Sequence, residues 1–272
     1  MLRRRRTHPR AGGRAALKEL NVMGAMQLFA ACQKAPSVQR VILKSTSEVY
    51  GSSPRDPVMF TEDGSSRRPP GEGFAKDSID IEGYARGLAR RRPDLSVTIL
   101  RLANMIGPPA MDTALSRFLA GPVVPSVLGY DARLQLLHEQ DALGVLERGD
   151  DLEPVGHVQR RCRGHHHDVA GDPAIGGAGP PAGARSALSA VDSLRRATRY
   201  TELDREQLNY VSYGRVMDTA RMRKDLGYNP KWTTAEAFDD YVRGRGLQPI
   251  LDPRWVRSIE NRAISAAQRL RR

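Results

Sequence analysis

Two short apolar runs, each ending in polar or turn-forming residues, constrain the fold of this chain most strongly. The first run covers residues 38–43 and leads into residues 45–51, and the second covers residues 95–102 and leads into residues 104–108. Between them, the apolar spacing of residues 79–89 suits a helix that crosses from one strand to the next. Ligands of open α/β sheets lie at the carboxyl ends of the strands. The pattern therefore predicts parallel strands with a candidate active site where both runs end.

Four segments give these predicted strands a family resemblance. The first strand leads into Ser-Thr-x-x-Val-Tyr-Gly, and the second ends in Arg-Leu-Ala-Asn-Met-Ile-Gly-Pro. An Asn-Val-x-Gly sequence lies upstream, and Asp-Leu-Gly-Tyr-Asn-Pro-Lys lies downstream. The segments are residues 21–28, 45–51, 101–108 and 221–231. In their order and spacing they resemble the extended short-chain dehydrogenases/reductases, in the NAD-dependent epimerase/dehydratase family, over roughly residues 15–148 and 187–245.

The resemblance implies an α/β fold with a Rossmann-like parallel sheet and a small, mostly helical C-terminal lobe. The family begins with a strand, a Gly-x-x-Gly-x-x-Gly turn and a helix, which together hold the pyrophosphate of NAD or NADP. No such turn precedes Asn21, and Gly12-Gly13 follows four arginines at residues 3–6 rather than an apolar strand. We therefore expect a partial sheet that lacks about its first four strands, and weak or absent binding of NAD or NADP. Asn21 remains a candidate cofactor contact by resemblance.

The acid/base pair of the family is replaced in this chain. The family uses a Tyr and, four residues later, a Lys, whose ammonium lowers the phenol pKa and holds the nicotinamide ribose. Counting back from Glu82, which falls where the family often has Glu, places Phe74 at the Tyr position and Ser78 at the Lys position. Both therefore lie where the family contacts the cofactor. Lys76 lies about 200° around the helix from Ser78 and cannot simply replace it, while Tyr84 is an alternative phenol one turn or more beyond.

Three further residues match site positions of the family, and each also has a simpler structural explanation. Thr46 matches the Ser/Thr that hydrogen-bonds the reacting oxygen, or is a strand-end hydroxyl bonded to backbone. Asn104 matches a substrate-contacting Asn, or is a turn residue at a strand end. Arg133 lies near where the family holds the nucleotide diphosphate of the substrate, or is a solvated Arg. We retain Thr46 as a candidate catalytic residue and Asn104 and Arg133 as candidate substrate-binding residues.

The function implied by the resemblance is that of an NAD(P)-dependent nucleotide-sugar epimerase/dehydratase-like protein, catalytically impaired or inactive in this form. An intact relative would accept and return a hydride at a nucleotide-sugar carbon. The alternative is a non-catalytic dinucleotide-binding or regulatory protein of the same fold. The expected partner is a nucleotide sugar or related small molecule, and the sequence leaves open whether the chain forms a homodimer through the family's usual helix pair.

Composition limits the other function classes. The formal net charge is +12, and the arginines near the N-terminus could neutralise several phosphates. Only six of the 43 basic residues are Lys, however, and no aromatic residue interleaves the Arg clusters, so a disordered basic tail is favoured over a nucleic-acid site. No apolar run approaches the roughly 20 residues of a membrane span and no signal-peptide pattern occurs, which favours the cytoplasm. Cys32 and Cys162 show no disulfide or metal-ligand spacing.

Residues 149–186 differ from the rest of the chain. They hold eight Gly, four Pro and four of the six His, with no Phe, Tyr, Trp or Met, so they have little to bury. One hypothesis is that this segment is translated out of frame, because suitable codons read one base later would encode a Phe-Asn-Val strand and a Ser-capped helix start. The competing interpretation is a genuine flexible linker. The nucleotide sequence of the gene decides between them. A metal site at residues 165–168, His-His-His-Asp, is not favoured, because adjacent side chains on one loop bind metal weakly.

The C-terminal part carries clear helix signals. A helical pattern over residues 218–226 ends at Gly227, a typical C-cap, and Thr233 to Glu236 forms a capping box for the next helix. Asp141 is expected to cap the helix that starts near it. The expected organisation is a basic disordered tail, a partial Rossmann-like domain, a disordered and possibly frame-shifted segment, and a substrate lobe with a basic tail helix. Their boundaries are 1–14, 15–148, 149–186 and 187–272.

Overall fold

The computed structural model describes residues 13–57, 59–62, 64, 69–108, 113–120, 132–151, 165–169 and 205–247. The helices are α1 (Gly13–Lys18), α2 (Gly24–Lys34), α3 (Gly73–Arg91), α4 (Ala114–Leu119), α5 (Glu139–Asp151), α7 (Arg205–Tyr213), α8 (Ala220–Leu226) and α9 (Thr234–Gly244), with a π-helical segment η1 (Glu19–Met23) and a 3-10 turn η2 (Ser47–Tyr50). The strands are β1 (Arg40–Thr46), β2 (Ser96–Leu102), β3 (Asn104–Ile106), β4 (Arg133–Leu134), β5 (Leu136–His138), β6 (His165–Val169) and β7 (Gly214–Arg215).

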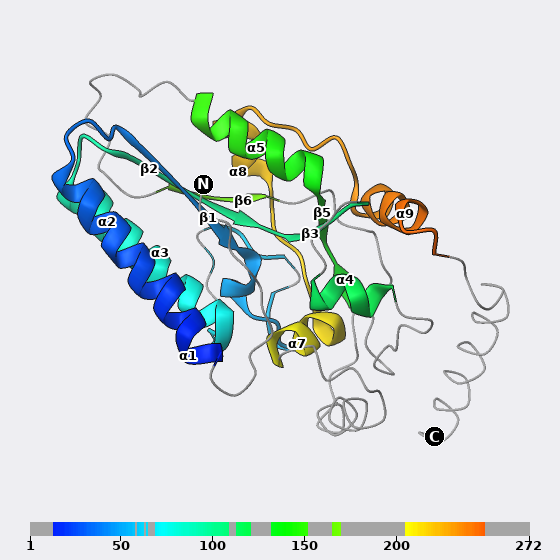
Figure 1. Cartoon of the computed structure of the whole chain (residues 1–272). Helices are drawn as coiled ribbons and strands as arrows, with labels where there is room; N and C mark the ends of the chain where they lie inside the picture. The colour runs from blue at the N-terminus through cyan, green and yellow to red at the C-terminus, as the bar shows by residue number, and fades with distance from the viewer. Residues whose placement is uncertain are drawn as a thin grey trace, which may run out of the picture.

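A parallel sheet of order β1-β2-β6 forms the centre of the molecule (Figure 1). Strands β1 and β2 pair in parallel from Arg40 opposite Ser96 to Thr46 opposite Leu102. Helix α3 connects them and packs on both, as the apolar spacing predicts, although it begins at Gly73, earlier than the predicted pattern. The two strands expected from the apolar runs are confirmed, and their carboxyl ends share one edge of the sheet.

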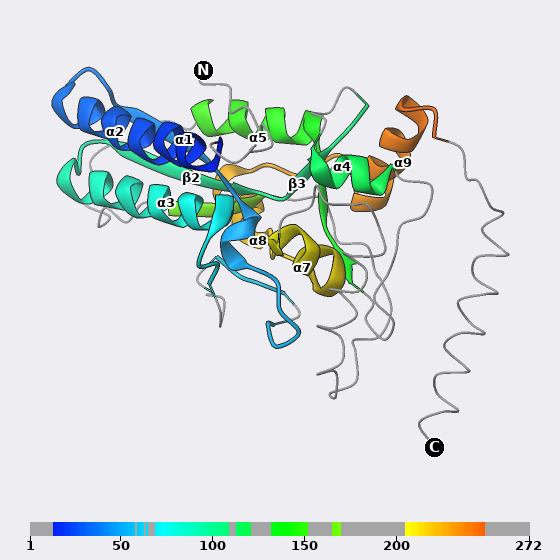
Figure 2. The same cartoon turned by 60° about the horizontal axis from the view of Figure 1, so that its bottom comes forward.

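Helices cover both faces of this sheet. Helices α2 and α3 lie on one face, and α5 and α8 lie on the other (Figures 1 and 2). The alternation of side chains along β2 explains the two layers, because Val97 and Ile99 pack with the α2/α3 cluster while Leu100 and Leu102 pack with the α5/α8 cluster. A strand with apolar residues on both faces is typical of parallel sheets buried between helices.

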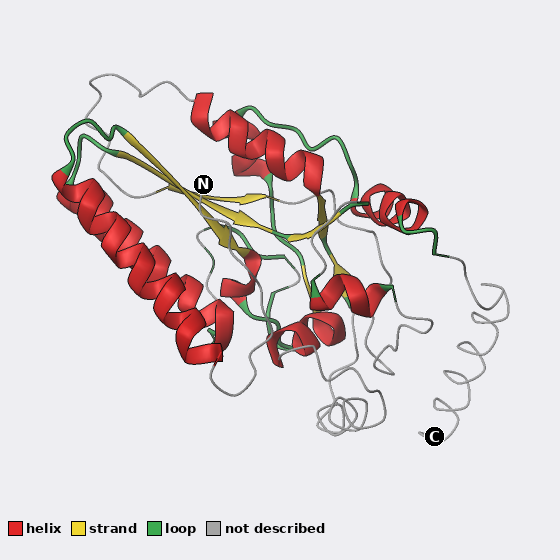
Figure 3. Ribbon diagram, in the orientation of Figure 1, coloured by secondary structure: helices red, strands yellow, loops and turns green. Residues whose placement is uncertain are grey.

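The C-terminal lobe consists mostly of helices around two short parallel strand pairs, β3 with β5 and β4 with β7 (Figure 3). Helix α9 packs on β3 and β5, and α7 packs on β4 and β7. A third apolar cluster fills the lobe and includes Phe118 of α4, Leu208 of α7 and Tyr241 of α9. The expected fold class is confirmed: an α/β chain with a partial Rossmann-like parallel sheet and a small, mostly helical C-terminal lobe.

The helix-end signals are confirmed. Gly227 follows α8 in the left-handed conformation, with φ +62° and ψ 23°. At α9, the Thr233 hydroxyl accepts from Glu236 N–H at 3.2 Å and the Glu236 carboxylate accepts from Thr233 N–H at 2.8 Å, which completes the capping box. Within the part of the chain that the structure describes, no helix is both long and apolar enough to cross a membrane.

The expected unstructured segments differ from the structure at three places. Helix α1 begins at Gly13, inside the predicted basic tail, and α5 continues to Asp151. The prediction of disorder over 149–186 is wrong at β6, whose backbone pairs in parallel with β2 from Thr98 opposite His165 onward. Sheet pairing supplies hydrogen bonds to a segment that carries no apolar pattern of its own. The rest of that segment, residues 1–12 and the predicted tail helix lie outside the described residues, and the domain boundaries stay predictions.

Candidate functional site

The carboxyl ends of β1 and β2 bring the first two predicted site residues to one edge. Thr46, the last residue of β1, lies opposite Leu102 of β2, and Asn104 follows two residues later. The Thr46 hydroxyl accepts a hydrogen bond from the backbone N–H of Glu48 at 3.2 Å and so caps the turn η2. The strand-end role of Thr46 is therefore present in the structure, and its role in catalysis stays a prediction.

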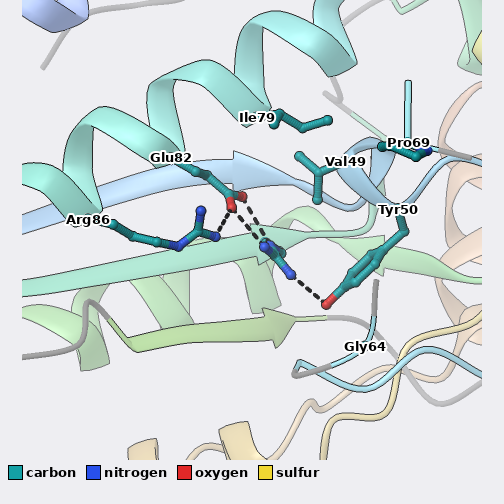
Figure 4. A pocket seen from close by; sticks show the side chains of 8 residues that line it. Val49, Tyr50, Gly64, Pro69, Ile79, Glu82 and Arg86 are labelled. Atoms are coloured by element: carbon teal, nitrogen blue, oxygen red, sulfur yellow. Dashed lines mark hydrogen bonds and ion pairs between the residues drawn. The ribbon is translucent and has the colours of Figure 1, made fainter. Parts of the chain in front are cut away.

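A buried ion-pair network joins α3 to the two strands beneath it (Figure 4). Glu82 of α3 is 1% exposed, and Arg101 of β2 donates to both of its oxygens, from Nε at 3.0 Å and from Nη2 at 2.8 Å. Ser45, which lies opposite Arg101 in the strand pairing, donates to Glu82 at 2.6 Å. Arg86, one turn further along α3, donates at 2.6 Å, and Arg101 Nη1 reaches Tyr50 Oη at 2.7 Å. The alternation of side chains along each strand thus points Ser45 of β1 and Arg101 of β2 toward α3.

The electrostatics of this network favour the ionised form of the Glu82 carboxylate. Burial raises the pKa of Glu82, but the hydrogen bonds and charge of Arg101, the hydroxyl of Ser45 and the charge of Arg86 outweigh it, so the pKa lies below its ordinary value. Both oxygens already accept hydrogen bonds from charged donors. A carboxylate held in this way is a poor general base, and we assign Glu82 a structural role.

A small hollow lies beside the network. Its volume is about 190 Å³, below the roughly 300 Å³ at which ligand pockets for small molecules usually begin. The residues that line it come from η2, α3, β2 and the loop before α3: Val49, Tyr50, Gly64, Pro69, Ile79, Glu82, Arg86 and Arg101. Because most of its polar groups are already paired with one another, this hollow is too small and too self-contained to hold a nucleotide sugar.

The face of α3 at the acid/base positions carries no proton-transfer group. Ser78 is 2% exposed and its hydroxyl donates to the backbone carbonyl of Phe74, one turn earlier, at 2.9 Å. Lys76 forms an ion pair with Asp80 at 2.5 Å, and Tyr84 is 38% exposed on the outer side of the helix. Neither Lys76 nor Tyr84 therefore replaces the pair. Whether Phe74 and Ser78 contact a cofactor stays a prediction.

Asn21 lies in the π-helical segment η1, between α1 and α2, and is half-buried. Its backbone carbonyl accepts a hydrogen bond from the N–H of Gly24. Single π-helical turns often occur at functional sites, because they shift the side chains around them by one position. The cofactor-binding role of Asn21 stays a prediction.

A second buried polar cluster joins the strand edge to the C-terminal lobe. The Tyr210 hydroxyl of α7 donates to the carbonyl of Gln135 at 2.8 Å and accepts from the N–H of Gln135 at 3.1 Å. The side chain of Asn104 also hydrogen-bonds this hydroxyl. Burial raises the pKa of Tyr210 above its ordinary value, so the phenol stays protonated at neutral pH. Asn104 is thus part of a network that ties the second strand to the lobe.

Arg215 is the main member of this region that the sequence pattern did not single out. It is 4% exposed, and its Nη1 donates to the carbonyl of Gly51 at 3.0 Å and to the hydroxyl of Ser52 at 3.1 Å. Its guanidinium carbon lies 4.8 Å from the centre of the Tyr210 ring. The only available signal was a lone Arg next to the apolar residues Val216-Met217, which is too weak to separate a buried charge from a solvated one.

Arg133 lies on β4, next to the strand that carries Arg215. It is half-buried and lies opposite Gly214 of β7, while Leu134 lies opposite Arg215. Gly214 has φ +72°, and a Cβ there would lie 2.4 Å from the backbone nitrogen of Arg133. The close approach of these two strands therefore requires glycine. The substrate-binding role of Arg133 stays a prediction.

Asp141 does not have its predicted capping role. Helix α5 begins at Glu139, and the Asp141 side chain, 0% exposed, points instead toward the C-terminal lobe. It accepts hydrogen bonds from Tyr228 Oη at 2.8 Å, from Lys231 N–H at 2.9 Å and from Trp232 N–H at 3.0 Å. Tertiary contacts outweigh the local cap, because the fully buried Asp141 carboxylate needs hydrogen-bond donors and the lobe supplies three.

The described residues include no glycine-rich turn of the kind that holds the pyrophosphate of a dinucleotide. Helix α2 leads into β1 through a connection without glycine, and none of the described strands is followed by a Gly-x-x-Gly-x-x-Gly turn. Ser78, which the resemblance places at the position of the family's ribose-holding Lys, has its hydroxyl bonded to its own helix. Within the described ranges, no group of three or more His, Cys, Asp or Glu side chains is placed to hold a metal ion.

Comparisons with known proteins agree with this architecture. Residues 8–129 match the model of the NAD dependent epimerase/dehydratase family. The chain is 68% identical over 263 residues to Uncharacterized protein Rv0501 of Mycobacterium tuberculosis (strain ATCC 25618 / H37Rv), covering 96% of this chain and 69% of that protein. Uncharacterized protein Mb0513 of Mycobacterium bovis (strain ATCC BAA-935 / AF2122/97) matches to the same extent.

Solved structures show the same fold. MoeE5 in complex with UDP-glucuronic acid and NAD superposes with a TM-score of 0.57 at 20% identity, covering 82% of this chain and 70% of that one. DesIV, a dTDP-glucose 4,6-dehydratase from Streptomyces venezuelae, superposes with a TM-score of 0.57 at 23% identity, covering 86% and 67%. Together with the family match, these findings show that the chain belongs to the NAD-dependent epimerase/dehydratase family of extended short-chain dehydrogenases/reductases.

Proposed function

We propose that this chain is a nucleotide-sugar-binding member of its family in which hydride chemistry is impaired or absent. One observation carries the proposal: at the acid/base positions, the Ser78 hydroxyl is bonded to the backbone carbonyl of Phe74, and no group on that face can take up and return a proton. General acid/base catalysis depends on a side chain whose pKa suits that exchange. Glu82, the next ionisable residue on this face, is committed to Arg101 and Arg86.

The ligand class follows from the family and from its solved members. MoeE5 was solved with UDP-glucuronic acid and with UDP-glucose, and DesIV with NAD and TYD. Thr46 and Asn104 lie at the sheet edge where α/β proteins bind ligands, and Arg133 lies in the lobe beside it. We assign Asn104 and Arg133 to the binding of a nucleotide sugar or a related small molecule, and Thr46 to the hydroxyl that would hydrogen-bond its reacting oxygen.

NAD or NADP is the cofactor that the family implies, and it would supply the hydride acceptor when bound. Asn21, Phe74 and Ser78 are the residues of this chain at cofactor-contacting positions. Phe74 and Ser78 offer neither a charge nor a proton for the dinucleotide, and the described residues contain no glycine-rich turn for its pyrophosphate. We therefore propose that these 272 residues bind the dinucleotide weakly or not at all.

The alternative is a non-catalytic dinucleotide-binding or regulatory protein of the same fold. It shares the loss of the acid/base pair but requires the dinucleotide to be retained. The first proposal predicts binding of a nucleotide sugar and the second predicts binding of the dinucleotide, so one binding measurement distinguishes them.

A homodimer in the cytoplasm completes the proposal. Several large apolar side chains on η1, α2 and α3 are exposed, including Leu20 at 64%, Met23 at 50% and Leu28 at 50%. These segments form one helical layer, and pairing of two copies through it would remove this apolar area from water. Sedimentation velocity checks this part, with a dimer expected.

The proposal is tested by equilibrium dialysis of the purified chain against UDP-glucose and, separately, NAD. We expect retention of UDP-glucose and little or no retention of NAD. Retention of NAD without UDP-glucose would support the regulatory alternative. Retention of neither ligand would show that the proposed binding function is wrong.

A further inference from the structure

Arg215 has hydrogen-bonding capacity that the protein does not use. Of the three nitrogens of its guanidinium, Nη1 donates to Gly51 and Ser52. The other two, Nε and Nη2, are buried, and no described residue accepts a hydrogen bond from either. Buried donors are nearly always satisfied in folded proteins, so an unsatisfied pair needs an explanation. Nε and Nη2 form the side-on fork with which Arg binds a carboxylate or phosphate through two parallel hydrogen bonds.

The guanidinium is held in a fixed position. Its Nη1 hydrogen bonds attach it to the loop after η2, and its carbon lies 4.8 Å from the centre of the Tyr210 ring. Tyr210 is itself fixed by three hydrogen bonds, two of them to the backbone of Gln135. A cation fixed by other contacts needs little further ordering when a ligand arrives, which favours binding.

Arg215 also lies where a ligand of this fold would bind. The loop that it contacts follows η2, directly after the carboxyl end of β1, and its neighbour Tyr210 is bonded to Asn104 at the carboxyl end of β2. It therefore bridges the sheet edge and the C-terminal lobe, which is where the proposed function places a nucleotide sugar.

Nearby acidic residues balance its charge without occupying the fork. Burial lowers the pKa of Arg215, and the charges of Glu48, Glu206 and Asp56, together with Tyr210, act in the opposite direction. None of these groups accepts a hydrogen bond from Nε or Nη2. The guanidinium stays charged, as Arg does in proteins, and its buried fork has no acceptor among the described residues.

We propose that Arg215 is an anion-recognising residue of the ligand site, and that its Nε and Nη2 receive two oxygens of an acidic group on the ligand. The inference rests on the proposed function, in which the ligand is a nucleotide sugar. Every nucleotide sugar offers its diphosphate as such a group, and one whose sugar is a uronic acid also offers a sugar carboxylate. If the acceptor is the sugar carboxylate, Arg215 decides whether an acidic or a neutral sugar is preferred; if it is the diphosphate, Arg215 contributes equally to both.

The test is calorimetric titration of the chain with UDP-glucuronic acid and UDP-glucose, which differ only in the carboxylate. Arg215→Met should weaken binding of UDP-glucuronic acid by about 10- to 100-fold, the usual effect of charge-assisted hydrogen bonds. If the sugar carboxylate is the acceptor, binding of UDP-glucose is unchanged; if the diphosphate is the acceptor, both ligands weaken. Unchanged affinity for both ligands in a folded variant overturns the inference.

Two further variants control for folding and net charge. Arg215→Lys keeps a buried cation but removes the fork, so it should also weaken UDP-glucuronic acid, and it replaces Arg215→Met if the latter does not fold. Arg90→Met removes one charge from an exposed position of α3 and should bind as the unaltered chain does. An equal loss of affinity in Arg90→Met would show that net charge, rather than Arg215, is responsible.

Failure of the proposed function is recognised separately. If the unaltered chain binds neither UDP ligand, the proposed function is wrong, and inorganic phosphate then tests Arg215 alone. Phosphate should raise the thermal midpoint of the unaltered chain more than that of Arg215→Lys, because anion binding to the folded state stabilises it. Equal shifts in both chains overturn the inference.

Discussion

At the scale of single residues, the buried ion pair of Glu82 and Arg101 has a structural role. Glu82 and Arg101 are both largely buried and joined by two hydrogen bonds, with Ser45 and Arg86 completing the set. A buried ion pair contributes little net stability over apolar packing, but removing one partner leaves an uncompensated charge and costs about 3–5 kcal/mol. The network therefore fixes the position of α3 over β1 and β2 rather than providing a reactive group.

The stability of the folded chain should depend on pH through Glu82. Its pKa is lower in the folded state than the ordinary value of 4.5, so the folded state binds this proton less readily than the unfolded chain. Its contribution is complete above 4.5 and is lost as the pH falls through the lowered folded value. In urea unfolding from neutral pH into the acid range, Glu82→Gln should therefore lose less free energy of unfolding than the unaltered chain.

The control for this prediction is Asp239→Asn, which removes a carboxylate from an exposed position of α9. Its acid dependence should follow that of the unaltered chain. If Glu82→Gln and the unaltered chain lose stability in parallel, Glu82 is not the group responsible.

The sequence allowed us to predict which residues share a helix face, because spacing determines it. It did not allow us to predict which polar residues are buried, because distant parts of the chain determine that. The position of Ser78 relative to Phe74 and Glu82 followed from counting along one helix face, and their shared face is seen in the structure. Arg215 could not be predicted, because its burial depends on Gly51 and Ser52, more than 160 residues earlier in the chain. The prediction that Asp141 caps its helix is wrong for the same reason, since Asp141 accepts hydrogen bonds from residues about 90 positions later in the chain, such as Lys231.

At the scale of elements, the pairing of β4 with β7 depends on one glycine. Gly214 has φ +72°, and a Cβ there would lie 2.4 Å from Arg133 N. Gly246 has a similar φ of +62°, but a Cβ there would meet nothing within 4 Å. The two glycines thus share the conformational demand, and only Gly214 also faces a steric limit.

Replacement of each glycine by alanine should separate these two effects. Gly246→Ala should cost roughly 1–2 kcal/mol, the usual penalty for a left-handed alanine. Gly214→Ala adds a clash with backbone, which cannot move aside without breaking the strand pair, so its cost should be clearly larger. The free energy of unfolding of both variants in urea checks this prediction, and equal costs would mean that the two strands separate without penalty.

Elements with strong local patterns could be predicted, and those made by pairing could not. Strands β1 and β2, helix α3, the Gly227 cap and the capping box of α9 all follow from periodicity or from capping chemistry. The two-residue strands β4 and β7 are too short to show any period. Strand β6 has a His-rich sequence without an apolar pattern, and its pairing with β2 defines it.

At the scale of the whole molecule, three apolar clusters hold the described parts together. One cluster lies on each face of the β1-β2-β6 sheet, and the third fills the C-terminal lobe. Asp141 and Arg215 are the polar connections between the sheet and the lobe, and both are buried. The chain thus has the fold of the family, and Phe74 and Ser78 lie where the resemblance places the acid/base pair.

The most direct test of this account is whether the chain transfers a hydride. The purified chain is mixed with NAD and UDP-glucuronic acid, and the absorbance of reduced nicotinamide is followed against a sample without protein, with product analysis on the same mixtures. Because the resemblance places Phe74 and Ser78 at the acid/base positions, we predict no reduced nicotinamide and no new sugar nucleotide. Formation of either, lost in Thr46→Ala, would contradict the account.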